Sequence, residues 1–213
     1  MNQELRSQLI SIARENTPSG DPAHDFQHIL RVLKNAELIA VSENADLDVV
    51  IPAALFHDIV MYRKDDPRSK MASEESAAVA RDVLEALAGY PKIKIEFVCS
   101  AISTCSFSKG IAPVFLEAKI LQDADGLESI GAISVMRTFS STGQMNRPFY
   151  NPEDPFCENR DPEVEKYALD LFFSRLLLVQ SRLHTDLAKK MGARRSLFLR
   201  AFLAEFKSEL DAV

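Results

Sequence analysis

With 213 residues, 46% of them hydrophobic and 26% charged, the chain has the length and composition of an ordinary globular protein with a sizeable core. The formal net charge of −6 disfavours binding to nucleic-acid polymers, whose phosphates would meet an acidic surface. Apolar stretches fall far short of the roughly 20 residues that span a bilayer, and the first residues lack the apolar core of a secretory signal. Three cysteines without CxxC spacing indicate neither a disulfide framework nor a zinc knuckle, so we expect a cytoplasmic protein.

Composition and apolar periodicity favour helices along the whole chain. The first predicted helix is ended by the turn formers at 17–22. Asp25 is a plausible N-cap for a second helix, whose apolar residues recur at helical spacing up to Ile39. His28 lies one turn before the apolar Val32 and is therefore expected to point inward. The loop before this helix carries a further histidine, His24.

A third helix is predicted from about Leu47 to His57, with Asp46 or Asp48 as its cap. Pro52 lacks a backbone donor, so we expect a bend or a late helix start there. The pair of His57 and Asp58 ends this helix among apolar neighbours on every side. Burying charge without a partner costs several kcal/mol, and a metal ion would supply that partner.

The segment 63–70 places four cations in eight residues of an acidic protein, which favours either a solvated turn or a phosphate contact. Ser73 is expected to cap a helix that stops near Gly89, and Pro91 is expected to start another. After a loop at 106–113, a short helix at 114–121 leads to Asp123. Cys105, at the end of the preceding helix, is expected to be a small buried residue.

Asp125 is followed three residues later by Glu128, which has the form of a capping box for a helix at 127–142. This pattern makes Asp125 structural and leaves Asp123 as the metal ligand. The segment 143–162 is long enough for a lid, and helices are predicted at 163–183 and 185–210. The aromatic face of the last helix is either core or a dimer surface, so a homodimer is compatible with the sequence.

His28, His57, Asp58 and Asp123 together provide two imidazoles and two carboxylates. This donor set suits an ion of the Mn, Fe, Co, Ni or Zn group better than Ca, while Mg remains compatible with it. The four residues therefore predict a site for one divalent ion.

These motifs resemble the HD-domain metal-dependent phosphohydrolase superfamily, whose pattern is H…HD…D in an all-helical domain. The match is closest to its small bacterial YedJ-like and YpgQ-like branch. It is carried by the Asp-x-x-His-x-x-Arg-Val frame around His28, by Ala-Leu-Phe-His-Asp-Ile at the His57 pair and by Ile-Leu-Gln-Asp-Ala-Asp around Asp123. The resemblance implies one all-α HD-type domain over residues 1–213, with the metal-site core at about 20–130 and a covering loop and two helices at 143–213.

The resemblance also implies a phosphohydrolase that acts on a nucleotide or a related small phosphate ester, either at a monoester or between phosphates. His28, His57, Asp58 and Asp123 would be the metal ligands, and Asp58 would also orient the attacking water. Lys64 is the first choice for a catalytic phosphate contact. The other expected substrate contacts are His24, Arg63 and Lys109.

At two positions this chain differs from the sequences of that branch. It has Cys105 where a histidine is common and Gly126 where an arginine is common. The missing histidine leaves open an alternative function as a catalytically impaired, nucleotide-binding or regulatory HD module. A dinuclear oxygenase is a further alternative, but it needs more histidines than the four that this chain has.

Overall fold

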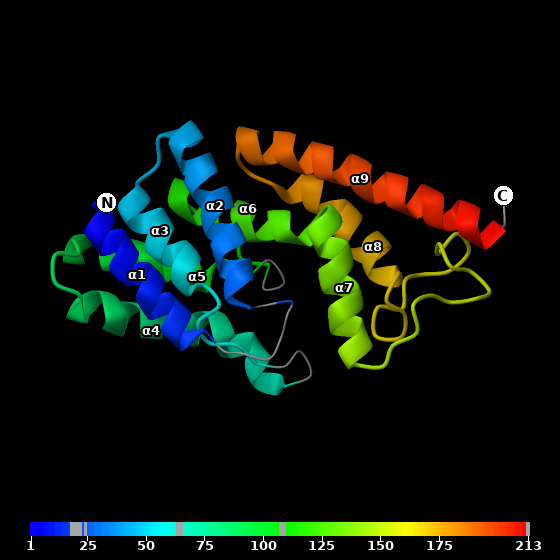
Figure 1. Ribbon diagram of the computed structural model, residues 1–213, viewed down its shortest axis with the longest axis horizontal. Coiled ribbons are helices and arrows are strands. Elements are labelled where there is room, and N and C mark those ends of the chain that lie inside the picture. Colours follow the sequence, from blue (N-terminus) through cyan, green and yellow to red (C-terminus); the bar gives the residue numbers. More distant parts are fainter. Residues whose placement is uncertain (18–22, 24, 63–65, 107–109, 212–213) are drawn as a thin grey trace. The chain divides into compact units, whose positions relative to one another are not determined.

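The computed structural model describes residues 1–17, 23, 25–62, 66–106 and 110–211. Over these residues it contains nine α-helices, short 3-10 helices and no β-strand (Figure 1), which confirms the prediction of an all-α fold. The chain divides into two compact units, Met1–Asp125 and Gly126–Val213. The prediction of a single domain stays a prediction. Of the helices described, none has the length and apolar character needed to span a bilayer.

The first unit is a bundle in which α3 is the central element. Residues 49–56 of α3 are all buried, and α3 packs against α1, α2, α4 and α5. Helix α6 ends one residue beyond the boundary of this unit, which is at Asp125. The helices of the unit are α1 (Gln3–Asn16), α2 (Phe26–Glu43), α3 (Leu47–Phe56), α4 (Ala72–Ala86), α5 (Ile95–Ser103) and α6 (Leu116–Gly126).

The predicted caps of α2 and α3 are confirmed. The Asp25 side chain accepts a hydrogen bond from the backbone N–H of His28, and the Asp46 side chain accepts one from the N–H of Asp48. These bonds satisfy backbone donors that have no partner within the helix itself. The start of α2, and with it His28, is thereby fixed by the residue that precedes the helix.

Pro52 lies inside α3, which begins at Leu47, so the expectation of a late helix start is wrong. Proline has no N–H to donate to the carbonyl four residues earlier, which belongs to Asp48. The hydroxyl of Tyr90 donates to that carbonyl instead, at 2.7 Å. A residue from outside the helix therefore replaces the hydrogen bond that Pro52 removes.

Helix boundaries differ from the prediction where 3-10 turns intervene. The predicted cap at Ser73 is wrong, because the 3-10 helix Pro67–Met71 runs directly into α4. The helix predicted from Pro91 begins as the 3-10 helix Lys92–Lys94 and continues as α5.

The second unit has an aromatic core formed by α7 (Ala132–Gln144), α8 (Asp170–Ser174) and α9 (Asp186–Asp211). The ring of Phe172 lies 6.0 Å from that of Phe139 and 5.7 Å from that of Phe202. Two 3-10 helices complete the unit, Leu127–Ser129 and Leu176–Arg182.

The helix predicted at 163–183 is replaced by a loop, by α8 and by the second of these 3-10 helices. The Asp170 carboxylate accepts hydrogen bonds from both terminal nitrogens of Arg160, at 2.5 and 2.8 Å, and from the N–H of Glu163, at 2.6 Å. These bonds hold residues 160–163 against the start of α8, which is incompatible with a helix at 163–169.

Candidate metal site

His57 is held in a defined orientation at the end of α3. Its Nδ1 lies 2.9 Å from the backbone carbonyl oxygen of Ala54, one turn earlier. A carbonyl only accepts, so Nδ1 is the protonated nitrogen and Nε2 carries the lone pair. Nε2 is buried and has no hydrogen-bond partner among the residues that the structure describes. The side chain thus presents a buried nitrogen ligand.

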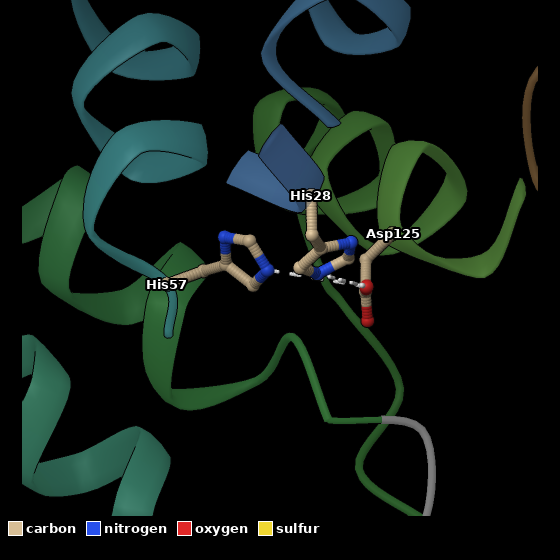
Figure 2. Close-up of side chains that lie close together, drawn as sticks. All are labelled: His28, His57 and Asp125. Atoms are coloured by element: carbon tan, nitrogen blue, oxygen red, sulfur yellow. Dashed lines mark ion pairs between the residues drawn. The ribbon is translucent and has the colours of Figure 1, made fainter. Parts of the chain in front are cut away.

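His28 lies in the first turn of α2 and is fully buried. Its ring centroid lies 5.5 Å from that of His57, with the two rings inclined by 66°. Figure 2 shows that the two imidazoles and the Asp125 carboxylate point toward one another, from α2, from the residue that follows α3 and from α6. Residues distant in sequence are therefore brought to one place by the packing of the first unit.

Two carboxylates approach the Nε2 atoms of both histidines. Asp58 Oδ2 lies 3.6 Å from Nε2 of His28 and 3.5 Å from Nε2 of His57. Asp125 Oδ1 lies 3.6 and 3.9 Å from the same two atoms. Both carboxylates are about one-third exposed, at 32% and 33%, whereas both imidazoles are buried. The histidines therefore form the buried side of the site, and the aspartates form its solvent-accessible side.

This geometry fits a divalent ion. Ligand atoms of His28, His57 and Asp125 all lie within 4.8 Å of one another. Two atoms that each bind one ion at about 2.1 Å are roughly 3.0 to 3.6 Å apart for angles between 90° and 120°. The Nε2 lone pair of His57 and a carboxylate oxygen are both acceptors, so their approach is favourable when a cation or a proton lies between them.

The predicted role of Asp125 as a helix cap is wrong. Helix α6 continues through Gly126, and the 3-10 helix that follows begins without a side-chain capping bond. Asp125 is therefore a residue of α6. It lies beside the two histidines, whereas the sequence analysis predicted Asp123 as the ligand that accompanies them. Asp123 is 1% exposed and does not belong to the ligand group found among the described residues.

A sequence signal for Asp125 exists once the end of α6 is known. Asp125 follows the buried Leu121 by four residues and the buried Ala118 by seven, so the three share one face of the helix. The capping-box pattern concealed this periodicity, because it ended the helix before Asp125.

Cys105 borders the site and is buried, as expected. Burial, followed by the negative charges of Asp125 and Asp58, raises the pKa of its thiol well above the usual value. The thiol is therefore protonated and inert as a nucleophile.

Several predicted substrate contacts lie outside the described residues: His24, Arg63, Lys64 and Lys109. Their roles stay predictions. Of the same basic segment, Arg68 is described. Its guanidinium donates to both carboxylate oxygens of Asp66 and lies over the Tyr62 ring, 4.6 Å from the centroid. The hydrogen bonds from Arg68 lower the pKa of Asp66, which makes this carboxylate a poor proton donor.

The chain is similar to known proteins along almost its whole length. The family model for the HD domain matches residues 25–130. The YpgQ protein of Bacillus subtilis is 28% identical over 99% of this chain and 94% of its own length. Its crystal structure in complex with ADP aligns with a TM-score of 0.72, over 97% of this chain and 95% of YpgQ.

Two further crystal structures agree with this assignment. An HD-superfamily hydrolase from Bacillus thuringiensis is 27% identical, with a TM-score of 0.76 and 99% of each chain covered. A predicted HD-superfamily hydrolase from an uncultured Thermotogales bacterium is 30% identical, with a TM-score of 0.63, over 95% of this chain and 91% of that one. The paired histidines and aspartates of the first unit and these similarities together show that the chain belongs to the HD-domain family of metal-dependent phosphohydrolases.

Proposed function

We propose that the chain hydrolyses a nucleotide, or a closely related small phosphate ester, at a metal site formed by His28, His57, Asp58 and Asp125. The observation that carries this proposal is the approach of two carboxylates to within 3.9 Å of two buried imidazoles. Two nitrogen and two oxygen donors suit a divalent transition metal such as manganese.

When bound, such an ion supplies a water of lowered pKa and polarises a phosphoryl oxygen. The residues of the chain provide the framework for that chemistry. The Ala54 carbonyl accepts a hydrogen bond from Nδ1 of His57 and thereby keeps the Nε2 lone pair directed into the site. Metal-binding histidines are commonly oriented by such a hydrogen bond from their other ring nitrogen. Asp58 and Asp125 are partly exposed, so their carboxylates are accessible to water and substrate. Asp58 is the residue proposed to orient the attacking water.

The proposal of a nucleotide substrate is supported by the ADP complex of YpgQ, which is 25% identical to this chain in that structure. Cleavage at a monoester would release phosphate, and cleavage between the α- and β-phosphates of a triphosphate would release pyrophosphate. The two reactions differ in which phosphorus atom is attacked, so the released product distinguishes them.

The experiment is a panel of nucleoside mono-, di- and triphosphates incubated with manganese-loaded protein, with phosphate and pyrophosphate assayed separately. We expect turnover that Asp58→Ala and Asp125→Ala each reduce by at least about 10³-fold, because each removes a ligand. Asp82→Ala is the matched control, since Asp82 is an exposed carboxylate on α4 outside the ligand group. Turnover that survives both ligand variants would contradict the proposal.

A regulatory module is the second candidate. It is favoured by Cys105, which occupies the border of the site without the proton-transfer capacity of a histidine. Tight binding of a nucleotide to the metal-loaded protein, without release of phosphate or pyrophosphate, would support this candidate over the hydrolase.

A further inference from the structure

Asp58 is the candidate ligand that is positioned neither by a helix nor by a carbonyl partner of its own. His28 and Asp125 belong to helices, and the His57 ring is oriented by its bond to a carbonyl in α3. Asp58 instead lies in the turn that leads away from the end of α3. Its carboxylate nevertheless lies 3.6 and 3.5 Å from the Nε2 atoms of the two histidines. The backbone after α3 must therefore be held from outside that helix for this ligand to stay in place.

The support comes from Ser76 of α4, which is fully buried. Its hydroxyl accepts a hydrogen bond from the backbone N–H of Val60, at 3.1 Å, and donates one to the carbonyl oxygen of the same residue, at 3.3 Å. Backbone polar groups outside helices and sheets need such partners, because burying them without one is unfavourable. One side chain thus satisfies both backbone polar groups of a residue that lies two positions after Asp58.

The position of Ser76 on α4 is otherwise suited to an apolar residue. Ala80 and Leu84 follow it at intervals of four residues, so the three share one face of the helix, and all are fully buried. A hydroxyl among apolar side chains is unfavourable unless it is hydrogen-bonded. Packing alone therefore does not account for a serine at this position, whereas the hydrogen bonds to Val60 do.

The residue before Ser76 attaches the same segment to α4 a second time. The Glu75 carboxylate accepts a hydrogen bond from the hydroxyl of Tyr62, at 2.5 Å. The N–H of Ile59 donates to the last carbonyl of α3, at 3.2 Å, which closes the turn that contains Asp58. The segment that carries Asp58 is therefore fixed to the end of α3 on one side and to α4 on the other.

We propose that Ser76 is a positioning residue for the metal ligand Asp58. By holding the backbone at Val60, it keeps the Asp58 carboxylate directed at the two histidines. The inference rests on the proposed function, since it assumes one divalent ion at the candidate metal site. Ser76 is not itself a ligand and acts through Asp58. Removing partners that orient a ligand typically lowers metal affinity by about 10 to 100-fold.

The test compares Ser76→Ala with Ser73→Ala by Mn²⁺ titration of the full chain, followed by electron paramagnetic resonance. Ser73 is the matched control, because it is also a buried serine of α4. Its hydroxyl contacts the Glu74 carboxylate and the Ser103 carbonyl, at 3.3 and 3.4 Å, and not the segment after Asp58. Circular dichroism checks that both variants are folded.

Ser76→Ala is expected to weaken Mn²⁺ binding by about tenfold, and Ser73→Ala is expected to leave it within about threefold of the wild type. The Ser76→Ala change is then repeated in two weakened backgrounds, Asp58→Asn and Asp125→Asn. Because Ser76 acts through Asp58, its loss is expected to change the affinity by less than about threefold in the Asp58→Asn background. In the Asp125→Asn background the loss is expected to remain about tenfold.

Three outcomes would overturn the inference and leave the proposed function intact. They are Ser76→Ala protein that binds Mn²⁺ like the wild type, Ser73→Ala protein that is weakened as much as Ser76→Ala, and equal effects of Ser76→Ala in the two backgrounds. The last two would show a general loss of structure rather than an effect through Asp58. A wild type that binds no Mn²⁺ would instead overturn the metal site of the proposed function, and this inference with it.

Discussion

At the scale of single residues, the site depends on where lone pairs and charges point. The Ala54 carbonyl fixes the His57 tautomer, and with it the direction of the Nε2 lone pair. Asp125 and Asp58 each approach both imidazoles, so the loss of one carboxylate leaves an incomplete set of donors. The contribution of each aspartate can therefore be separated by substitution.

Asp125→Asn is expected to lower the affinity for Mn²⁺ by at least about 10 to 100-fold, because a neutral amide replaces a charged ligand. Asp123→Asn is expected to leave this affinity within about threefold of the wild type, since Asp123 is not part of the ligand group described. Isothermal titration calorimetry measures both. The reverse result would restore Asp123 as the ligand.

The two aspartates also show which parts of this candidate site can be predicted from the sequence and which depend on packing. His28 could be predicted to point inward because helical spacing relative to Val32 is a local property. Choosing between Asp123 and Asp125 requires knowing where α6 ends, and a local capping pattern competed with the tertiary packing that extends the helix to Gly126. Tertiary packing determines where α6 ends, and tertiary packing cannot be predicted from a short stretch of sequence.

At the scale of elements, two helices depend on partners from elsewhere in the chain. Helix α3 contains Pro52 because Tyr90 donates to the carbonyl that the proline leaves without its usual donor. Helix α8 starts at Asp170, whose buried carboxylate binds Arg160 and the Glu163 N–H. Caps such as Asp25 and Asp46 were predictable because they act over two or three residues, whereas these long-range bonds were not.

Tyr90→Phe is expected to destabilise the protein by about 1 to 2 kcal/mol, because the Asp48 carbonyl loses the donor that the buried Tyr90 provides. In a Pro52→Ala background the same change is expected to cost less, since the new N–H of residue 52 can donate to Asp48. Urea unfolding of the four proteins in this double-mutant cycle gives the coupling energy. Strict additivity would show that the Tyr90 hydroxyl does not replace the missing helical bond.

The contact between Arg160 and Asp170 predicts a pH dependence. Burial alone would raise the pKa of Asp170, but the hydrogen bonds from Arg160 and from the Glu163 N–H outweigh it and lower the pKa of this carboxyl below its usual value. A carboxylate with a lowered pKa stabilises the fold above its ordinary pKa, and this stabilisation is lost as the pH falls through the lowered value.

Asp170→Asn is expected to cost about 3 kcal/mol at neutral pH, because it leaves the Arg160 charge without its partner. The difference in free energy of unfolding between wild type and variant should stay constant above about pH 5 and shrink toward pH 2. Chemical denaturation across this range measures it. A difference that is independent of pH would contradict the role of the Asp170 charge.

At the scale of the whole molecule, composition and periodicity were sufficient for the fold class, because the elements in the described part of the chain are all helices. Family membership followed from three short motifs that meet only in the folded first unit, around His28, His57 and the end of α6. The hydrogen bonds of Ser76 were not predictable from the sequence, because they depend on how α4 packs against the segment after Asp58.

Binding of an ion only to the native state predicts an increase in global stability. At a free Mn²⁺ concentration 100 times the dissociation constant, the gain is about 2.7 kcal/mol. Metal-free protein is therefore expected to unfold at a lower temperature, and added Mn²⁺ is expected to reverse this in the wild type. Calorimetric scans with and without chelator measure the shift, which is expected to vanish in His57→Ala.

The most direct test of the central claim is titration of metal-free protein with Mn²⁺, followed by calorimetry or by electron paramagnetic resonance. The account predicts one ion per chain in the wild type, and loss of binding by at least about 100-fold when His28, His57, Asp58 or Asp125 is replaced by alanine. Asp82→Ala should bind like the wild type. Binding that is absent in the wild type, or unchanged in the four ligand variants, would contradict the claim that these side chains hold one divalent ion.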